Sequence, residues 1–507
     1  MRADLLALPR TLYSAGYIRA AEPILAHRLG IPLYRVMEAA GQAAWERVKQ
    51  QWPIATRVSV LCGGGNNAGD GYVVARLAHQ AGLTVKLYQH RPFERLTGDA
   101  DRAQQAWLAA GGVVEDLAAK WDEADLCIDA LVGSGLKGPL RAPMAEVVAR
   151  VNRLSIPILS LDIPSGLNGE TGAVESEAVR ATATLTLVGA KPGLLTGRAL
   201  EHIGTLWFAP LQLGDEMDKV DIQAEGPLAE TVVLLKPDRL KQWLPTRSQA
   251  SHKGDHGRLL VIGGNEGMAG AARLAGEAAL RSGTGLVAVN CHRDSVVPVQ
   301  FSRPELMVRE WGALASAQKI PWADALVLGP GLGQCPAALA RFREALSVPS
   351  PMLLDADALN LLAASPKKRT QQDCNWILTP HSGEAARLLG QSVAKVESDR
   401  FAAIRALQQR YGGVVVLKGA GTVIYDGKEM ALAVVGNSGL ATGGSGDLLS
   451  GIIGGLLAQG LAPMQAACAG VMIHGEAADS ALAPGPRGML PSDLLPEIRR
   501  WVNFEVI

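Results

Sequence analysis

The glycine-rich stretch Gly436–Gly451, GNSGLATGGSGDLLSG, has the residue types and spacing most suggestive of chemistry. An apolar helical pattern begins directly after Asp447, so the glycines form a turn that opens a helix. Such a turn presents unpaired backbone N–H groups and the positive end of the helix dipole, which together bind anions. An aspartate there is electrostatically unfavourable unless it accepts a proton, for example from a hydroxyl that attacks a phosphate. In an isolated GSGD, Asp447 could equally serve only as a helix cap.

A second glycine loop, GGGNNAGDG at Gly63–Gly71, follows an apolar run in the other half of the chain. Gly63, Gly65 and Ala68 fit a relaxed dinucleotide fingerprint, GxGxxA. An NAD-dependent dehydrogenase would place an acidic residue about 20 residues further on, to hold the ribose. The next apolar run instead ends in Gln89–His90–Arg91. The loop therefore predicts a phosphate-binding turn but argues against an ordinary dehydrogenase.

Carboxylates follow two further apolar runs of the first half. Asp129 opens the segment DALVGSGLKG, and Asp162 lies in LDIPSG, just before Ser165. Taken singly, either aspartate could merely cap or form a turn. Together with Asp70 they would lie on one rim, because the carboxyl ends of parallel strands meet at one edge of a sheet. Three convergent carboxylates invite a cation, and ligands that are all oxygen favour a hard cation over zinc.

Short apolar runs that alternate with helical segments must position these loops, as is typical of parallel sheets covered on both faces. The first set is Val58–Cys62, Thr84–Tyr88, Asp125–Asp129, Ile156–Asp162 and Thr184–Val188. The second set is Leu259–Gly263, Leu286–Asn290, Ala325–Leu328, Met352–Asp355, Trp376–Leu378 and Val414–Leu417. An acidic, glycine-containing stretch separates the two sets. The pattern predicts two α/β domains at residues 1–213 and 231–507, joined by a linker at residues 214–230.

Composition narrows the function classes. Of 507 residues, 48% are hydrophobic and 19% charged, and Lys+Arg and Asp+Glu balance at 49 each. No basic field is available for nucleic-acid binding, and no apolar run approaches the ~18 residues that span a membrane. The six cysteines are scattered without a CxxC pair, and the N-terminus lacks the apolar core of a signal peptide. We expect a cytoplasmic protein with small-molecule partners.

In combination, the motifs resemble one known family, the bifunctional NAD(P)H-hydrate repair enzymes. GNNAGDG, DALVGSGLKG, LDIPSG, SHKGDHGRLLVIGG, GPGLG, TPHSGE, LKGAGT and NSGLATGGSGDLLSG occur in the family's order, in a match running from about Thr11 to beyond Asp493. The resemblance implies an N-terminal NAD(P)HX epimerase with a Rossmann-like three-layer α/β/α sandwich. It also implies a C-terminal ADP-dependent NAD(P)HX dehydratase with a ribokinase-like fold. The substrate, NADHX or NADPHX, is NADH or NADPH hydrated at C6 of the nicotinamide ring.

The resemblance also implies roles in the first domain. Asp162 would be the acid–base group and contact the substrate beside C6, and Asn67, Asp129 and Ser165 would bind K⁺. Dinucleotide contacts would be Asn66, Asn67, Ala68, Gly69, Asp70, Gly133, Ser134, Gly135, Leu136, Lys137, Gly138 and Pro139. Ala68 stands where the family usually has glycine, and it would be strained if that position required a positive φ. Lys137 is either a phosphate partner or a solvated surface lysine.

In the second domain, the resemblance implies that Gly331, His381 and Asp447 contact the hydrated dinucleotide, with Asp447 as the catalytic base. The ADP-binding residues would be Lys418, Gly419, Ala420, Gly421, Thr422, Asn437, Ser438, Gly439, Leu440, Ala441, Thr442, Gly443, Gly444, Ser445 and Gly446. Leu440 replaces a common family methionine, a swap that conserves volume. Mg²⁺ is a further candidate cofactor. The chain contains no GxxxxGK[ST] segment, which argues against a P-loop.

We therefore predict an enzyme that epimerises R- and S-NAD(P)HX and dehydrates the S epimer while converting ADP to AMP and phosphate. The alternative is a ribokinase-like kinase of a small alcohol, such as a hydroxymethylpyrimidine or thiazole, fused to a non-catalytic nucleotide-binding scaffold. We expect a homo-oligomer without nucleic-acid or membrane partners. Neither the preference between NADHX and NADPHX nor the use of ATP in place of ADP follows from the sequence.

Overall fold

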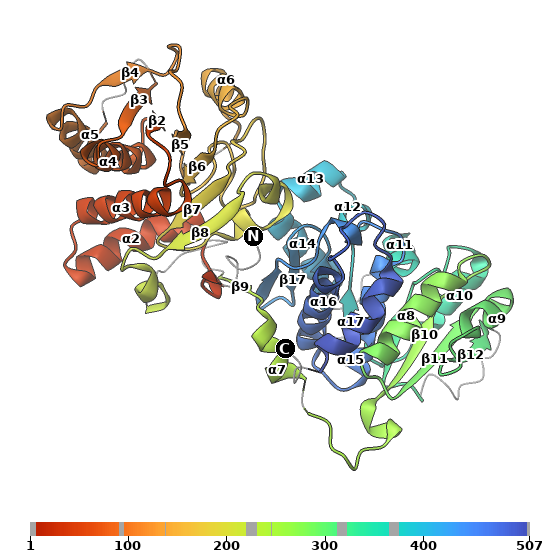
Figure 1. Cartoon of the computed structure of the whole chain (residues 1–507). Coiled ribbons are helices and arrows are strands. Elements are labelled where there is room, and N and C mark those ends of the chain that lie inside the picture. The colour runs from red at the N-terminus through yellow and green to blue at the C-terminus, as the bar shows by residue number, and fades with distance from the viewer. Residues whose placement is uncertain are drawn as a thin grey trace. The chain divides into compact units, whose positions relative to one another are not determined.

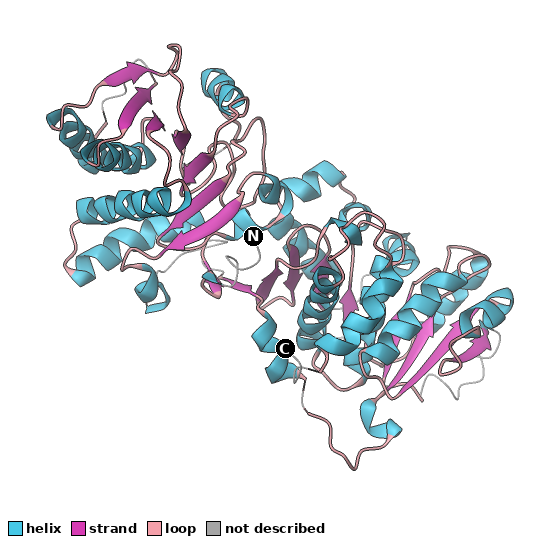
Figure 2. Ribbon diagram, in the orientation of Figure 1, coloured by secondary structure: helices cyan, strands magenta, loops and turns pink. Residues whose placement is uncertain are grey.

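A computed structural model describes residues 7–90, 96–136, 138–219, 231–244, 246–311, 322–364 and 375–503 of the chain (Figure 1). The chain divides into two units, Met1–Val233 and Leu234–Ile507. In both units helices flank a sheet, as Figure 2 shows, which confirms the prediction of two α/β domains. The expected linker begins with the 3-10 helix η3 (Gly214–Lys219), and its remaining residues lie outside the described part of the chain.

The first unit contains a seven-stranded sheet in which all neighbouring strands are parallel. Its spatial order is β4 (Val114–Asp116), β3 (Thr84–Gln89), β2 (Arg57–Cys62), β5 (Leu126–Ala130), β6 (Ile158–Leu161), β7 (Ala183–Leu187) and β8 (Thr205–Ala209). Every residue of β5, β6 and β7 is buried, as expected for parallel strands covered on both faces. The short strand β1 (Thr11–Leu12) instead pairs antiparallel with β9 (Val232–Leu234).

Helices cover both faces of this sheet. The helices are α2 (Ala15–Leu29), α3 (Leu33–Gln51), α4 (Asn66–Gln80), α5 (Gly98–Ala109), α6 (Ala142–Val151) and the 3-10 turns η1 (Pro192–Leu195) and η2 (Gly197–Glu201). Buried residues of α3, α4 and α5 share one apolar core with the sheet, whereas Val148 and Val151 of α6 join a second core that includes Leu61 of β2. The layers are therefore α/β/α.

The order of the strands locates a switch point in the first unit. The chain runs outward from β2 through β3 to β4, and then from β5 outward through β6, β7 and β8 on the other side. Since β2 and β5 are neighbours, the loops at their carboxyl ends diverge to opposite faces of the sheet. Ligands of open α/β sheets bind in the crevice at such a point.

The second unit repeats this plan in a mixed sheet. From one edge the order is β12 (Met307–Glu310), β11 (Leu286–Cys291), β10 (Arg258–Ile262), β13 (Ala325–Leu328), β14 (Met352–Leu354), β15 (Trp376–Leu378), β16 (Val414–Leu417), β17 (Thr422–Tyr425) and β18 (Met430–Ala433). Strands β12 to β16 are parallel, and the switch point lies between β10 and β13. The pairs β16–β17 and β17–β18 are antiparallel, an extension that the sequence pattern did not predict.

Six helices of the second unit, α7, α8, α9, α15, α16 and α17, contribute to one apolar core with its sheet. The elements are η5 (Pro237–Arg239), α7 (Leu240–Trp243), η6 (Lys253–His256), α8 (Ala269–Arg281), η7 (Arg293–Ser295), α9 (Val296–Gln300), α10 (Pro336–Ala345), α11 (Ala356–Ala364), α12 (Ser382–Leu389), α13 (Val393–Ser398), α14 (Arg400–Tyr411), η10 (Ser438–Leu440), α15 (Ser445–Ala458), α16 (Pro463–Ser480), η11 (Pro491–Asp493) and α17 (Leu494–Trp501). None of the described helices is long and apolar enough to cross a membrane.

The helix α15, which starts in the glycine-rich segment, packs closely against α8. A Cβ atom on Gly451 would lie 2.0 Å from the carbonyl oxygen of Ala275, and one on Gly455 would lie 2.5 Å from the hydroxyl of Ser282. Backbone atoms cannot yield as a flexible side chain does. Glycine at position 451 is therefore a requirement of the helix spacing, which in turn fixes where the first turn of α15 lies.

We predict that Gly451→Ala destabilises the second unit by about 1–3 kcal/mol, because the added methyl group overpacks the α8–α15 contact. Gly270→Ala is the matched control: Gly270 lies on exposed α8 surface, and a Cβ there has no heavy atom within 4 Å. Alanine also favours the helix over glycine. Calorimetric unfolding should show a lower transition temperature for Gly451→Ala alone. Equal transition temperatures for the two variants would contradict the packing argument.

Candidate active sites

A cavity of about 1160 Å³ lies at the switch point of the first unit. The loops that follow β2 and β5 form much of its wall, together with side chains from α2 and α3. Predicted site residues that line it are Asn66, Asn67, Asp70, Gly133, Ser134, Gly135, Leu136, Pro139 and Asp162. The sequence therefore located this cavity from two glycine loops and a strand end. The predicted contact Lys137 lies outside the described residues.

Two glycines allow the loops of the cavity to touch. A Cβ on Gly63 would lie 1.9 Å from the carbonyl oxygen of Leu131, and one on Gly133 would lie 3.1 Å from Cβ of Asn67. The first helical residues of α4 follow at once, so the positive end of its dipole faces the cavity. This is a suitable place for the phosphates of a dinucleotide.

Three predicted contacts that the structure describes, Ala68, Gly69 and Gly138, do not line the cavity wall. Ala68 and Gly69 are buried within α4, where a Cβ on Gly69 would lie 2.5 Å from the sulfur of Met37. Ala68 does not have a positive φ, so the alanine that replaces the family's usual glycine introduces no strain. Gln89, at the place where a dehydrogenase has its ribose-binding acid, accepts a hydrogen bond from the Tyr72 hydroxyl (2.6 Å) and donates to the Gly63 carbonyl (3.2 Å). The amide of Gln89 thus joins the loop that follows β2, where an ordinary dehydrogenase would have a carboxylate that binds the ribose.

Asp162 is held at the cavity in a strained backbone conformation, with φ +64°. Its Oδ1 accepts hydrogen bonds from the Leu187 N–H (3.2 Å) and from the Lys191 ammonium. Lys191 is 1% exposed, whereas Asp162 is 15% exposed. Lys191 also donates to the carbonyls of Leu187 and Gly189, at 3.1 Å each. A buried cation thus supports a carboxylate that faces the cavity.

Three more carboxyl groups line the same cavity, Glu22 from α2, Asp70 from α4 and Asp99 from α5. Burial, and then the charge of Asp162, raises the pKa of Glu22. Burial, followed by the charges of Asp162 and Glu22, raises the pKa of Asp70 well above its usual value. Groups that share a cavity but differ so much in environment are suited to acid–base chemistry.

The prediction that Asp70, Asp129 and Asp162 surround one cation is wrong. Asp129 is fully buried, and its carboxylate accepts hydrogen bonds from the hydroxyl of Ser160 (2.7 Å) and the N–H of Ser165 (2.9 Å). Burial raises the pKa of Asp129, and the hydrogen bonds of Ser165 partly oppose this. Within the described ranges, no group of three or more His, Cys, Asp or Glu side chains is placed to hold a metal.

Asn67 remains a candidate ligand for a monovalent cation. Its side chain is 8% exposed, yet neither its amide oxygen nor its amide nitrogen has a hydrogen-bond partner. A buried polar group without a partner carries a free-energy cost that a bound ligand removes. The hydroxyl oxygen of Ser165 accepts from the Val132 N–H at 2.8 Å. Oxygen donors of this kind suit K⁺ better than a transition metal.

In the second unit, the turn that opens α15 forms an anion site with Lys418. Gly444 has φ +95° and caps the helix, so the first N–H groups of α15 are directed outward. A Cβ on Gly446 would lie 3.4 Å from the Lys418 ammonium. Lys418 follows β16, and its ammonium donates to Asp355 at 2.8 Å. The predicted segments around Lys418 and Gly446 therefore meet, and they combine an ammonium with a helix dipole.

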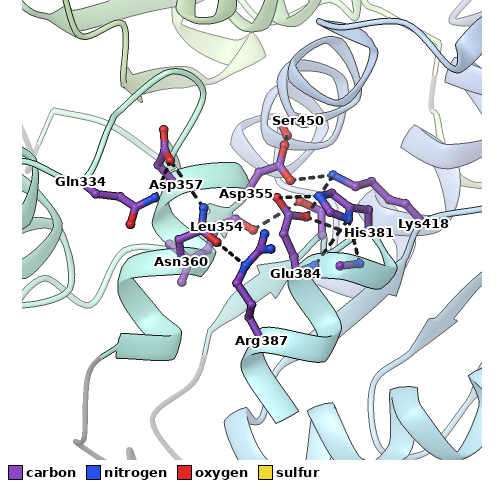
Figure 3. A network of polar contacts seen from close by, with 12 residues as sticks. Gln334, Leu354, Asp355, Asp357, Asn360, His381, Glu384, Arg387, Lys418 and Ser450 are labelled. Atoms are coloured by element: carbon purple, nitrogen blue, oxygen red, sulfur yellow. Dashed lines mark hydrogen bonds and ion pairs between the residues drawn. The ribbon is translucent and has the colours of Figure 1, made fainter. Parts of the chain in front are cut away.

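Asp447 lies in the same cluster of charges (Figure 3 shows its neighbours). Burial, and then the charge of Asp355, raises the pKa of Asp447 to about 6, although Lys418 acts in the opposite direction. Burial lowers the pKa of Lys418, but the carboxylates of Asp355 and Glu384 outweigh this effect and raise it. The site thus combines a permanently charged ammonium with a carboxyl group that can exchange a proton near neutral pH.

His381 lies beside this cluster at the start of α12. Its Nδ1 accepts from the Gly383 N–H (2.9 Å), and its Nε2 lies 3.5 Å from Glu384 Oε1. Burial, followed by the charges of Lys418 and Arg387, lowers the pKa of His381. With Nδ1 occupied, the neutral ring carries its proton on Nε2 and can act there as a donor. Burial raises the pKa of Glu384 to about 7.

Two further predicted residues of the second unit, Gly331 and Asn437, lie in the loops after β13 and β18. Gly331, in the loop after β13, has φ +58°, and its carbonyl accepts from Asn265 at 2.6 Å. The amide of Asn437 donates to the Ala478 carbonyl (3.0 Å) and its oxygen accepts from the Gly439 N–H (2.9 Å). The side chain of Asn437 therefore shapes the loop, which leaves backbone groups to contact a nucleotide.

Several polar residues of the two candidate sites were not predicted from the sequence, namely Glu22, Lys191, Asp355, Asp357, Glu384 and Ser450. Asp355 is the clearest omission, because it ends the predicted strand Met352–Asp355 as Asp129 and Asp162 end theirs. The same strand-end rule could have found it. Lys191 and Ser450 gave no such signal, since a lysine in a loop and a serine in an apolar helix are common.

Two α/β units with a polar site at each set of strand ends define a bifunctional nucleotide-binding enzyme. Residues 259–500 match the family described as NAD(P)H-hydrate dehydratase, and residues 33–193 match YjeF-related protein N-terminus. The bifunctional NAD(P)H-hydrate repair enzyme of Escherichia coli K12 is 46% identical over 100% of this chain and 96% of its own length. The enzyme of that name from Vibrio cholerae is 43% identical over 98% of this chain and 99% of its own length. The chain belongs to this family of bifunctional NAD(P)H-hydrate repair enzymes.

Solved structures support the fold of the C-terminal unit. A ribokinase-like superfamily protein from Enterococcus faecalis is 28% identical, with a TM-score of 0.50 over 56% of this chain and 98% of that chain. A hypothetical protein from Streptococcus mutans is 31% identical, also with a TM-score of 0.50, over 54% of this chain and all of that chain. The C-terminal unit is ribokinase-like, as predicted.

We predict that Lys191→Met destabilises the first unit by about 3 kcal/mol, because it leaves Asp162 without the buried cation that compensates it. The double variant Lys191→Met/Asp162→Asn should lose much less than the sum of the two single changes, since the neutral pair leaves no uncompensated charge. Denaturant unfolding of the four proteins measures this coupling. Additive losses would show that the two side chains do not depend on each other.

Proposed function

We propose that the C-terminal site dehydrates S-NAD(P)HX at the expense of ADP and that the N-terminal site interconverts the R and S epimers. The observation that carries the proposal is the meeting of Lys418, the first turn of α15 and Asp447. An ammonium and a helix N-terminus bind a phosphate, and a carboxyl group with a pKa of about 6 accepts a proton near neutral pH.

For dehydration, the C6 hydroxyl oxygen attacks the terminal phosphorus of ADP, and Asp447 takes the hydroxyl proton. The bond from that phosphorus to the bridging oxygen breaks, and AMP leaves. Lys418 and the N–H groups of Gly443–Gly446 stabilise the charge that develops on the phosphoryl group. The new phosphate ester then leaves C6 as the ring nitrogen donates its electron pair. Loss of a proton from C5 completes the double bond of NAD(P)H.

The contacts proposed for the two substrates of this site follow from the same arrangement. ADP would contact residues 418–422 and 437–446, and the hydrated dinucleotide would contact Gly331, His381 and Asp447. A kinase of a small alcohol would use the same phosphate site, but it would release a stable phosphorylated product. Family membership favours dehydration, and the appearance of AMP and free phosphate distinguishes the two reactions.

For epimerisation, Asp162 would take the proton of the C6 hydroxyl as the bond from C6 to the ring nitrogen breaks, and would return it when the nitrogen closes on the other face of the C6 carbonyl. The cavity also contains Glu22 and Asp70. The dinucleotide would lie along residues 66–70 and 133–139, with its phosphates at the start of α4. Asn67, Asp129 and Ser165 would hold K⁺, whose charge would stabilise anionic groups of the substrate. The unpartnered amide of Asn67 supports this ligand set.

Several finer properties belong to the same proposal. The epimerase domain would comprise residues 1–213 and the dehydratase domain residues 231–507, separated by the linker at residues 214–230. Mg²⁺ would accompany the phosphates of ADP, as it commonly does in phosphoryl transfer. We also propose a homo-oligomer that acts in the cytoplasm on NADHX and NADPHX.

We predict that Asp447→Asn lowers the rate of dehydration by about 10²- to 10⁴-fold, because asparagine keeps the shape of the side chain but cannot accept the proton. In the wild type, kcat/KM for dehydration should fall as the pH falls through about 6, where Asp447 becomes protonated. Absorbance at the NADH band measures the reaction with racemic NADHX and ADP. Epimerisation by the same sample is the control and should be unchanged. Dehydration by Asp447→Asn at the wild-type rate would remove Asp447 from the mechanism.

We predict that Asp162→Asn reduces epimerisation to the uncatalysed rate and leaves dehydration intact. Asparagine is suited as the replacement because it tolerates the positive φ of this position. With racemic NADHX and ADP, the variant should repair the S portion quickly and the R portion only at the pace of spontaneous epimerisation. Rapid repair of both epimers would show that another group, such as Glu22 or Asp70, is the base.

A further inference from the structure

Asp355 is a buried carboxylate whose two oxygens accept hydrogen bonds from two different side chains. It directly follows β14 at the carboxyl edge of the sheet, and its side chain is 2% exposed. Its Oδ1 accepts from the Lys418 ammonium at 2.8 Å, and its Oδ2 accepts from the Ser450 hydroxyl at 2.7 Å (Figure 3). Ser450 lies on α15, one turn after Asp447.

We propose that Asp355 is a positioning residue of the dehydratase, which acts by fixing the Lys418 ammonium against the phosphate-binding turn at Gly446. Ser450 in turn fixes the carboxylate of Asp355. This inference rests on the proposed dehydratase function and assigns a role within it to two residues outside the predicted site.

The distances around Gly446 support this role. From a Cβ built on Gly446, the Lys418 ammonium is 3.4 Å away and Asp355 Oδ2 is 3.7 Å away. A carboxylate so close to an anion site would repel a phosphate if its charge were not compensated. The ammonium of Lys418 compensates the charge of Asp355, and the Ser450 hydroxyl donates to its second oxygen, so the repulsion of a phosphate is reduced. Glu384, another carboxylate near Lys418, is 3.9 Å away and accepts a hydrogen bond from the backbone N–H of His381 at 2.8 Å.

Lysine needs such a partner because its four-carbon chain is flexible and its ammonium has no preferred direction. Lys418 is 19% exposed, so without Asp355 the ammonium could turn towards Glu384 or solvent. A displacement of about 1 Å at a reacting group can cost on the order of 10²-fold in rate. The Asp355–Ser450 pair therefore ties the cation at the end of β16 to the helix that carries Asp447.

The charge of Asp355 also acts on Asp447, which provides an independent readout. The charged groups that face Asp447 are Asp355 and Asp357, which raise its pKa, and Lys418, which lowers it. Glu384 of α12 and His381, which caps that helix, interact electrostatically with Lys418. His474 of α16 contacts the Ser445 hydroxyl. Burial lowers the pKa of His474 to about 4, so it is neutral at working pH. Removal of the charge of Asp355 should therefore lower the pKa of Asp447.

The test compares Asp355→Asn, Ser450→Ala, Lys418→Met and the double variant Asp355→Asn/Lys418→Met in the full-length protein, with S-NADHX and ADP. We expect Asp355→Asn to lower kcat about 10- to 100-fold and to shift the acidic limb of the pH profile to lower pH. Ser450→Ala keeps the charge, so it should lower kcat several-fold without moving the limb. In the Lys418→Met background, Asp355→Asn should cause little further loss of rate.

Equal losses from Asp355→Asn with and without Lys418 would overturn the proposal, because Asp355 would then act independently of the ammonium. Wild-type kcat in Ser450→Ala would also overturn it, and this variant remains informative if Asp355→Asn does not fold. Epimerisation reports only on the folding of the N-terminal unit. The folded fraction of each sample is therefore also measured by circular dichroism. Failure of the proposed function is distinguishable, since the wild type itself would then release no AMP.

Discussion

Both sites depend on a close backbone contact at a switch point, which only glycine permits. Gly63 directly follows β2, and its Cβ position lies 1.9 Å from the Leu131 carbonyl. Gly263 directly follows β10, and its Cβ position lies 2.0 Å from the Pro330 carbonyl. In each unit the first loop of one half-sheet thus rests on the first loop of the other. A side chain at either glycine would push apart the loops that form the crevice.

Close backbone contacts at glycines also determine where helix termini lie. The first turn of α4 follows directly after Gly65 and lines the N-terminal cavity. In the C-terminal unit the first turn of α15 reaches Lys418 and Asp355, because Gly451 lets α15 approach α8. Two helix N-termini, one in each unit, therefore supply positive potential at the strand ends. We propose that phosphate groups of the substrates bind at these two helix termini.

The sequence predicted what periodicity and glycine spacing encode. The eleven apolar runs are strands, and the loops of Gly63–Gly71 and Gly436–Gly451 both open helices. It did not predict the strands β17 and β18, because an antiparallel hairpin after a parallel series has no distinct period. It did not reveal that Asp129 accepts hydrogen bonds from buried hydroxyls, since strand-end position alone does not tell what a carboxylate faces. Contacts between residues distant in sequence, such as Asp355–Ser450, leave no local pattern.

Buried lysine–carboxylate pairs appear in both sites, but with opposite orientation. In the first, Lys191 is 1% exposed behind Asp162, which is 15% exposed. In the second, Asp355 is 2% exposed behind Lys418, which is 19% exposed. Each hidden partner compensates the charge that its neighbour presents, so neither charge is left alone in a low-dielectric interior. The first site consequently offers its substrate a carboxylate, suited to moving a proton, and the second offers an ammonium, suited to holding a phosphate. The same kind of pair, reversed, thus presents a carboxylate in one unit and an ammonium in the other.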